Sequence, residues 1–344
     1  MIWIGLKGLL RLEREILILI HQYINNGYHI VLDVNSGSVH VVDPVVYDAI
    51  AAVSEQVPEM DKPEKLSEEV TANVHKKLDE TYGSEMVCEA LEDIQELIDT
   101  EQLLTRDIYR DFVLDFKKRK TVVKALCLHI AHDCNLACRY CFAEEGEYHG
   151  RRALMSYEVG KKALDFLVAN SGNREHLEVD FFGGEPLMNF DVVKELVAYG
   201  RENEGKYGKN IRFTITTNGI LLDDEKIKYI NEVMDNVILS IDGRPEVNDR
   251  MRKTVSGRGT YDIISKNYKN FISKREGLYY VRGTFTRYNL DFAEDVKHLL
   301  DQGFQNVSVE PVVTSPEYDY ALRDEDIERI LNEYDRLSDM YLER

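Results

Sequence analysis

Residues 132–146, HDCNLACRYCFAEEG, place Cys134, Cys138 and Cys141 in one short stretch, spaced C-x3-C-x2-C with Tyr140 before the last cysteine. Thiolate sulfur is a soft ligand that suits iron–sulfur sites. Three thiolates on one loop therefore predict ligands for three corners of a cubane [4Fe–4S] cluster. The fourth iron would have no protein ligand, which leaves it open to a substrate or to a second cofactor.

This cysteine loop has one alternative use as a metal site. A ferredoxin-type cluster needs a fourth cysteine, and a structural zinc needs a fourth Cys or His. His132 and His149 are close enough in the sequence to complete a Cys3His zinc site. The chain has five cysteines, and three of them are clustered, which excludes the pattern of a secreted disulfide scaffold.

Outward from the cysteine loop, short apolar runs alternate with amphipathic stretches such as SYEVGKKALDFLVAN, residues 156–170. The runs are ALCLHI (125–130), LEVDFF (177–182), IRFTIT (211–216), NVILSI (236–241), YYVRGTF (279–285) and NVSVEP (306–311). Six strands alternating with helices predict βα units and a parallel sheet, closed fully or partly into a barrel. We therefore expect an α/β fold, a partial (β/α)6 barrel, over residues 120–320.

Polar motifs follow three of these runs. In DFFGGEPLMN, Gly183 and Gly184 allow a close approach of backbone to a ligand, and Glu185 offers an acceptor for an ammonium group. ITTNG (215–219) and ILSIDG (238–243) end the next two runs. Parallel α/β folds place their sites at the carboxyl ends of the strands, so these motifs and the cysteine loop are expected to share one site.

Taken together, these motifs resemble the radical S-adenosylmethionine (SAM) superfamily, whose signature is a C-x3-C-x-aromatic-C loop after the first strand. The resemblance implies that SAM chelates the open iron, and that Arg252 pairs with the SAM carboxylate; a solvated surface arginine is the alternative for Arg252. An electron from a donor such as ferredoxin or flavodoxin would then split SAM to give a 5′-deoxyadenosyl radical. The SAM contacts implied are Tyr140, Phe142, Gly183, Gly184, Glu185, Pro186, Asn218, Ser240, Asp242 and Arg252.

Residues 21–115 predict a separate small domain. The stretch YHIVLDVNSGSVHVVD, residues 28–43, has two β-branched runs around the turn residues NSG, which predicts a hairpin. Three helical patterns follow, beginning near Pro44, Ser67 and Ser84. A hairpin with about three helices is an α+β arrangement that resembles a winged helix, and the charged residues 117–120 mark its expected boundary.

This N-terminal part and KALCLHIAHDCNLACRYCFA together resemble the maturases of SCIFF peptides (six cysteines in forty-five residues). The resemblance implies that residues 21–115 recognise the leader of a precursor peptide, and we expect strand addition at Val39-His40-Val41-Val42. The barrel mouth would receive the cysteine-rich core, abstract a hydrogen atom and join a cysteine sulfur to that carbon as a thioether. The catalytic residues that act on the peptide are unknown from the sequence.

Such maturases have a C-terminal SPASM-type region whose cysteines bind auxiliary iron–sulfur clusters. Residues 321–344 are expected to begin that region. No cysteine follows Cys141, so auxiliary clusters cannot be bound by this chain as given. We expect either that the sequence is truncated or that the protein is catalytically incomplete.

Two rival functions follow from the same residues. Another radical SAM modification of a protein, such as sulfatase maturation to formylglycine, uses the same barrel motifs. A peptide-binding scaffold without turnover is the rival from a different class. Absence of a bound cluster after anaerobic reconstitution would favour that scaffold function.

Composition and the remaining residues narrow the setting. The 43 basic and 62 acidic residues give a net charge of −19, which argues against nucleic acid or an anionic membrane as partner. Charged residues interrupt the apolar residues 1–20, and no cleavage site follows, so we expect an N-terminal extension of a cytoplasmic protein. A true start near His21 is the alternative.

Cys127 is expected to be a buried thiol, Cys88 to pack on a helix, and Glu310 to contact substrate at the barrel mouth.

Overall fold

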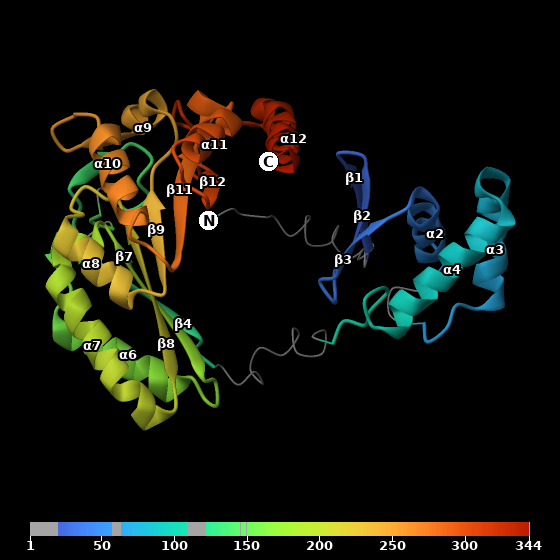
Figure 1. The fold of residues 1–344 in the computed structure, drawn as a ribbon, viewed down its shortest axis with the longest axis horizontal. Coiled ribbons are helices and arrows are strands. Elements are labelled where there is room, and N and C mark those ends of the chain that lie inside the picture. Colours follow the sequence, from blue (N-terminus) through green and yellow to red (C-terminus); the bar gives the residue numbers. More distant parts are fainter. Residues whose placement is uncertain (1–19, 57–62, 109–121, 145, 149, 344) are drawn as a thin grey trace. The chain divides into compact units, whose positions relative to one another are not determined.

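The computed structural model describes residues 20–56, 63–108, 122–144, 146–148 and 150–343, and Figure 1 shows its ribbon. The chain divides into two compact units, residues 1–119 and 120–344, which are described separately. The expected N-terminal extension lies almost wholly outside the described residues, and so does the charged run 117–120. Among the described helices, none is long and apolar enough to cross a membrane.

The first unit contains an antiparallel sheet in the order β1-β2-β3. Its strands are β1 (Ile20–Asn25), β2 (Tyr28–Asp33) and β3 (Val39–Val42). The sequence predicted the hairpin of β2 and β3 but missed β1. Asn26 and Gly27 form the turn between β1 and β2. Their φ angles are 50° and 78°, the left-handed backbone that Asn-Gly hairpin turns require.

Three helices pack on one another, and the first of them also packs against β1 and β2. They are α2 (Pro44–Ser54), α3 (Glu68–Tyr82) and α4 (Ser84–Asp99). The Ser67 side chain accepts a hydrogen bond from the Val70 N–H at the start of α3, as an N-cap does. Cys88 lies on a helix as expected, but the expectation that it packs was wrong: α4 buries Val87 and Ile94 on its core face, and Cys88 is exposed on another face.

The second unit is built on a seven-stranded sheet in the order β12-β11-β9-β8-β7-β4-β6. Its strands are β4 (Ala125–His132), β6 (Ala153–Leu154), β7 (His176–Gly183), β8 (Asn210–Thr217), β9 (Asn236–Ser240), β11 (Leu278–Phe285) and β12 (Val307–Pro311). Neighbours from β4 to β12 pair in parallel, and β6 adds an antiparallel edge. The six predicted parallel strands are therefore confirmed, and the structure shows that they are neighbours in chain order.

Helices follow the strands in βα succession, with short 3-10 turns at some strand ends. The helices are α6 (Tyr157–Asn170), α7 (Phe190–Tyr207), α8 (Asp224–Val233), α9 (Pro245–Met251), α10 (Tyr261–Ile272), α11 (Phe292–Asp301) and α12 (Ile327–Leu342). The 3-10 turns are η2 (Pro186–Asn189), η3 (Arg287–Asn289) and η4 (Asp324–Asp326). A further two-stranded ribbon pairs β5 (Leu136–Cys138) with β10 (Arg252–Thr254).

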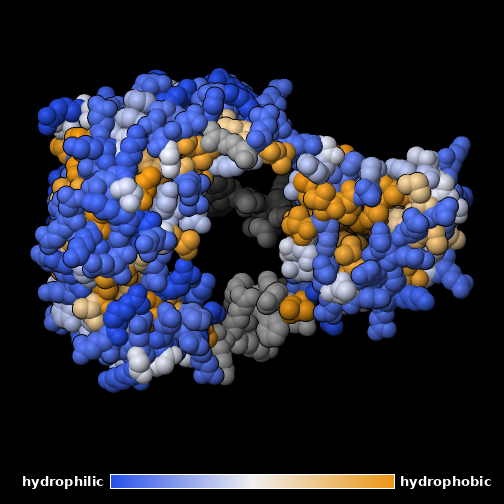
Figure 2. All heavy atoms as spheres, in the orientation of Figure 1, coloured by the Kyte–Doolittle hydropathy of each residue, from blue (hydrophilic) through white to orange (hydrophobic). Residues whose placement is uncertain are grey.

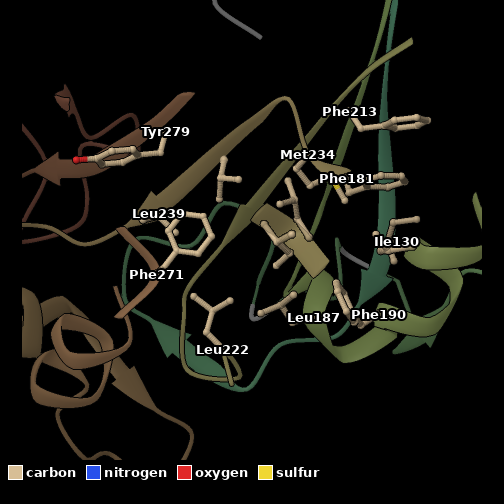
Figure 3. Packing of buried hydrophobic residues seen from close by; sticks show 14 of the residues in the cluster. Ile130, Phe181, Leu187, Phe190, Phe213, Leu222, Met234, Leu239, Phe271 and Tyr279 are labelled. Carbon is tan, nitrogen blue, oxygen red and sulfur yellow. The ribbon is translucent and has the colours of Figure 1, made fainter. Parts of the chain in front are cut away.

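The two faces of the central strands have different chemistry because side chains alternate along a strand. One face is apolar and packs on the helices: Phe181 of β7 and Phe213 of β8 stack with ring centroids 5.6 Å apart (Figure 3). The opposite, inner face is polar. Asp180 of β7, Thr214 of β8 and Arg282 of β11 lie on it, each next along its strand to a buried apolar residue. This inner face and the carboxyl strand ends are where a site can form.

Candidate active site

The ribbon of β5 and β10 fixes the cysteine loop. Cys138 lies opposite Arg252 in the register, and the Arg139 N–H donates to the Met251 carbonyl at 2.9 Å. The chain separates these segments by more than a hundred residues, so sequence analysis did not find this pairing. The ribbon therefore places a predicted SAM ligand, Arg252, directly beside the second cysteine.

A close backbone contact joins the Gly-Gly motif to the start of the cysteine loop. The Gly184 N–H donates to the Ala131 carbonyl at 2.7 Å, and the Glu185 N–H donates to the Asp133 carbonyl at 2.9 Å. A Cβ atom on Gly184 would lie 2.1 Å from the Asp133 oxygen, and one on Gly183 would lie 2.5 Å from the Ala131 oxygen. The glycines therefore permit protein backbone, and not only a ligand, to approach.

The strand ends and the cysteine loop enclose one cavity of about 490 Å³, which we call the cysteine cavity. Its lining includes all three cysteines of the loop. The other predicted residues that line it are Tyr140, Phe142, Gly183, Gly184, Asn218, Ser240 and Arg252. The remaining three predicted SAM residues, Glu185, Pro186 and Asp242, are buried and are not part of this lining.

Glu185 is fully buried and accepts three hydrogen bonds from the protein. Its donors are the Leu187 N–H at 3.0 Å, the Thr217 hydroxyl at 2.7 Å and the Asn218 N–H at 2.8 Å. Burial raises the pKa of Glu185, and these donors oppose that shift. In this arrangement Glu185 holds the end of β8, so that Asn218 reaches the cavity.

Tyr140, Asp242 and Arg252 form a buried polar network behind the cysteines. The Tyr140 hydroxyl lies 2.7 Å and 2.8 Å from the two Asp242 carboxylate oxygens, and Arg252 Nη1 donates to the same hydroxyl at 3.0 Å. Burial raises the pKa of Asp242 to about 6, although Arg252 and Tyr140 favour the ionised form. Because Arg252 is only 7% exposed, the surface-arginine alternative is wrong.

Two polar side chains at the cavity matter for ligand binding, Arg252 with an unpaired nitrogen and Asn218 with its amide already paired. Arg252 Nε is buried and has no hydrogen-bond partner among the described residues. Asn218 Nδ2 donates to Asn135 at 2.7 Å and lies 3.7 Å from the Cys134 sulfur. A buried guanidinium nitrogen without an acceptor is suited to a carboxylate ligand.

The thiols themselves are free, with no disulfide among the described cysteines. Burial raises the pKa of Cys134 to about 12 and that of Cys138 to about 11, so the metal-free thiols hold their protons. Metal binding replaces such protons. Within the described residues, no three His, Cys, Asp or Glu side chains form a group that could hold a single metal ion. His149, one of the two histidines of the zinc alternative, lies outside those residues.

The cavity also has an outer side, which the sequence indicated only through Glu310. Glu310 of β12 lines it and is ion-paired with Arg282 of β11. Arg282 and Thr216 were missed, although the two-residue alternation of their strands would have placed them on the inner face. The expectation for Cys127 was wrong, because it is an exposed thiol opposite Asp180 on that face.

Comparison with known proteins assigns this geometry to a family. Residues 128–278, which include the cysteine loop and the strands through β9, match the Radical SAM superfamily. The matched residues form a radical SAM domain. The domain is homologous to the cysteine-type anaerobic sulfatase-maturating enzyme of Clostridium perfringens, with 31% identity over 140 residues, 39% of this chain and 36% of that enzyme.

Other relatives are named for different activities. The Fe-coproporphyrin III synthase of Methanosarcina barkeri is 35% identical over 167 residues, 48% of this chain and 37% of that protein. Among solved structures, anSMEcpe with bound AdoMet and Kp18Cys peptide has a TM-score of 0.58 at 22% identity, over 65% of this chain and 62% of that one. The chain thus spans less than two thirds of the length of these relatives, and the likeness to anSMEcpe shows the fold.

Radical SAM domains use a [4Fe–4S] cluster and SAM, and the residues present fit both. Three free thiols from one loop line one cavity, as the protein ligands of a cubane would. Cys134, Cys138 and Cys141 would hold the cluster. The unpartnered Arg252 Nε would bind the SAM carboxylate.

The first prediction concerns the cluster. Replacing Cys134, Cys138 and Cys141 together with Ala should abolish the iron–sulfur absorbance and the bound iron, about four per chain in the reconstituted protein. Iron, sulfide and zinc analyses after anaerobic reconstitution measure this. Cys88→Ala with Cys127→Ala is the matched control and should keep the full iron content. Full iron in the triple variant, or stoichiometric zinc in the wild type, would show that the assignment is wrong.

The second prediction concerns the glycine contact. From the sequence alone, a larger residue at 184 should block SAM and leave the cluster intact. The 2.1 Å approach to the Asp133 oxygen changes this expectation, because a side chain there also displaces the cysteine loop. Gly184→Ala should therefore lower cluster retention and weaken SAM binding by about tenfold or more.

The control for this prediction is Gly205→Ala on α7, where an added Cβ meets no atom within 4 Å. It should leave both measurements unchanged. Iron content and equilibrium SAM binding, measured on the same preparations, separate the two effects. A Gly184→Ala protein with a full cluster and normal SAM affinity would contradict the backbone constraint.

Proposed function

We propose that this chain is a peptide-modifying radical SAM enzyme that installs a thioether in a ribosomally made, cysteine-rich peptide. In this proposal the N-terminal unit binds the leader of the precursor, and the core reaches the outer side of the cysteine cavity. The observation that supports it best is the presence in one chain of a radical SAM domain and a separate unit with an unpaired strand edge.

The reaction needs a hydrogen atom to leave a carbon of the peptide. When bound, the cluster and SAM supply a 5′-deoxyadenosyl radical that takes up this hydrogen atom. Closing the carbon–sulfur bond also releases the thiol proton and one electron, which a separate one-electron acceptor has to receive. Cys88 and Cys127 are the only cysteines outside the loop, so this sequence has no set of cysteines for a second cluster.

The residues of the chain have defined tasks in this reaction. Arg252 and Asn218 would orient SAM, with Tyr140 and Asp242 holding Arg252 in place from behind. Phe142 and Phe182, whose rings are 6.4 Å apart and nearly parallel, would cover the cavity and exclude water. The Arg282–Glu310 pair at the outer side would contact the peptide.

The N-terminal unit supports leader binding through β3. Among the described residues, β3 pairs only with β2, so its other edge is unpaired. The Asp33 N–H donates to the Ser38 carbonyl, which makes this a hydrogen-bonded pair. Hydrogen-bonded pairs alternate along an antiparallel ladder, so the backbone N–H and C=O groups of His40 and Val42 also point towards β2. The N–H and C=O groups of Val39 and Val41 therefore point outward, where an extended peptide can pair with them.

Formylglycine formation is the second candidate, supported by the homology to sulfatase-maturating enzymes. The products distinguish the two. A thioether removes two hydrogen atoms from the peptide and keeps its sulfur, whereas formylglycine formation from cysteine removes the sulfur. A scaffold without turnover would give neither product and no 5′-deoxyadenosine.

The third prediction tests SAM cleavage. The reconstituted protein with dithionite should release 5′-deoxyadenosine and methionine even without a peptide. Arg252→Gln removes the buried guanidinium and should raise the KM for SAM by about tenfold or more, while the three cysteines still hold the cluster. Lys253→Gln, an exposed neighbour on β10, is the matched control and should behave as wild type. Absence of 5′-deoxyadenosine from a fully loaded wild-type protein would favour the scaffold.

The fourth prediction tests the strand edge. Val41→Pro removes an outward N–H without removing a hydrogen bond of the β2–β3 ladder, and should weaken leader binding by about tenfold. The ligand is the leader of the cysteine-rich peptide encoded nearest the gene, measured by calorimetry. SAM cleavage without peptide should be unchanged, and circular dichroism checks folding. Equal leader affinity in a folded Val41→Pro protein would show that the leader binds elsewhere.

A further inference from the structure

A groove runs along the unpaired edge of β3 and is closed on its other side by α4. We call it the β3–α4 groove; its volume is about 830 Å³. Its lining is Gly27, Tyr28, His29, Val39, His40, Val41, Val42, Asp43, Pro44, Val46, Asp93, Glu96 and Leu97. All of these residues belong to the first unit, so the groove does not depend on how the two units are placed.

The two walls of the groove are tied together by hydrogen bonds near one end. His40 of β3 lies 3.1 Å from the Gln102 carbonyl, just after α4. The buried Asp33 accepts from the Thr105 N–H at 3.0 Å and from its hydroxyl at 2.6 Å. These contacts fix the end of α4 against the β2–β3 hairpin. A groove held open in this way costs a ligand little reorganisation.

The charge of the lining is one-sided. Asp43, Asp93 and Glu96 are exposed carboxylates, and no lysine or arginine lines the groove. None of the three has an ion pair with another described residue. The whole of α4 contains no basic residue. The wall opposite the strand edge is therefore anionic, and no side chain within the described unit neutralises it.

An extended peptide on the edge of β3 would turn every second side chain towards α4, about 6.6 Å apart. Asp93 and Glu96 are three residues apart, so they lie on one face of α4, separated by about 4.5 Å along the axis. Leu97, half-buried between them and the strand, offers apolar surface. A lysine or arginine fits this wall, because its aliphatic stem can cover Leu97 while its charged end reaches a carboxylate.

We propose that the β3–α4 groove selects an extended segment with lysine or arginine at alternate positions, so that the leader of the substrate is basic along the face that meets α4. The inference rests on the proposed function, since it assumes that β3 receives the leader. The strand edge provides affinity for any extended backbone, and the carboxylates decide which side chains are accepted.

The overall charge of −19 would attract any cationic peptide, so the test must separate local recognition from general attraction. The probes are three labelled ten-residue peptides with valine at odd positions and lysine, serine or glutamate at even positions. Fluorescence anisotropy with the full chain gives their affinities at about 0.05 M and 0.3 M salt, where screening differs. We expect the order lysine, serine, glutamate, with lysine ahead of serine by about three- to tenfold at low salt.

Two double variants on α4 decide between local recognition and general attraction. Each replaces two carboxylates with uncharged amides. Asp93→Asn with Glu96→Gln should remove most of the lysine preference and of its salt dependence. Glu89→Gln with Glu92→Gln removes equal charge at the same spacing outside the groove lining, and should keep the preference. An equal preference in both double variants, or none in the wild type, would overturn the proposal.

A separate result identifies failure of the proposed function itself. Val41→Pro should weaken all three peptides, and so should methylation of alternate backbone amides in the lysine peptide, which leaves the protein unchanged. If neither change affects binding, the peptides do not pair with β3, and the leader-binding role fails. If both changes weaken binding but the lysine preference is absent, strand addition stands and only the charge selection is wrong.

Discussion

The site of this protein depends on one steric constraint, the contact of three backbone segments around Asp133. A Cβ on Gly184 or on Gly146 would lie 2.1 Å or 2.9 Å from Asp133 backbone atoms, so only glycine fits at either point. The contact joins the end of β7 to both flanks of the cysteine loop. Backbone contacts therefore hold both flanks of the loop over the strand ends, and the Tyr140–Asp242–Arg252 network adds side-chain support between them. We therefore propose that the Gly-Gly motif serves the cluster as well as the second cofactor.

Around that contact, the protein concentrates buried charge where a charged ligand is needed. Glu185 and the Tyr140–Asp242–Arg252 network are removed from water, which is costly for ionised groups unless each finds partners. Glu185 has all of its partners in the protein, whereas Arg252 keeps one donor unused. That difference separates a carboxylate that shapes the site from a guanidinium that remains available to a ligand. It also explains why Glu185 is behind the cavity wall and Arg252 is part of it.

In the N-terminal unit, the feature of interest is the outer edge of β3, where the backbone N–H and C=O groups have no partner strand among the described residues. A three-stranded sheet packed against α2 keeps a free edge at β3, and apolar residues such as Tyr23 and Val41 are exposed on it. Figure 2 shows apolar atoms over the sheet and α2 of this unit. Free edges are aggregation hazards unless a partner or charge protects them. The acidic wall of α4 provides such protection, and in our proposal it also selects the partner.

The sequence by itself determined the radical SAM domain. The cysteine spacing, the six strand–helix repeats and the polar motifs at strand ends are local patterns, each set by a period or by ligand chemistry within a few residues. It missed β1, although Asn26-Gly27 is a strong hairpin signal, because the adjoining apolar residues resembled an extension. Only the tertiary structure decided that Arg252 lies beside Cys138, that Cys127 is exposed, and that Asp93 and Glu96 face the β3 edge. Those facts depend on residues far apart in the chain, and no local pattern records which distant segments the packing brings together.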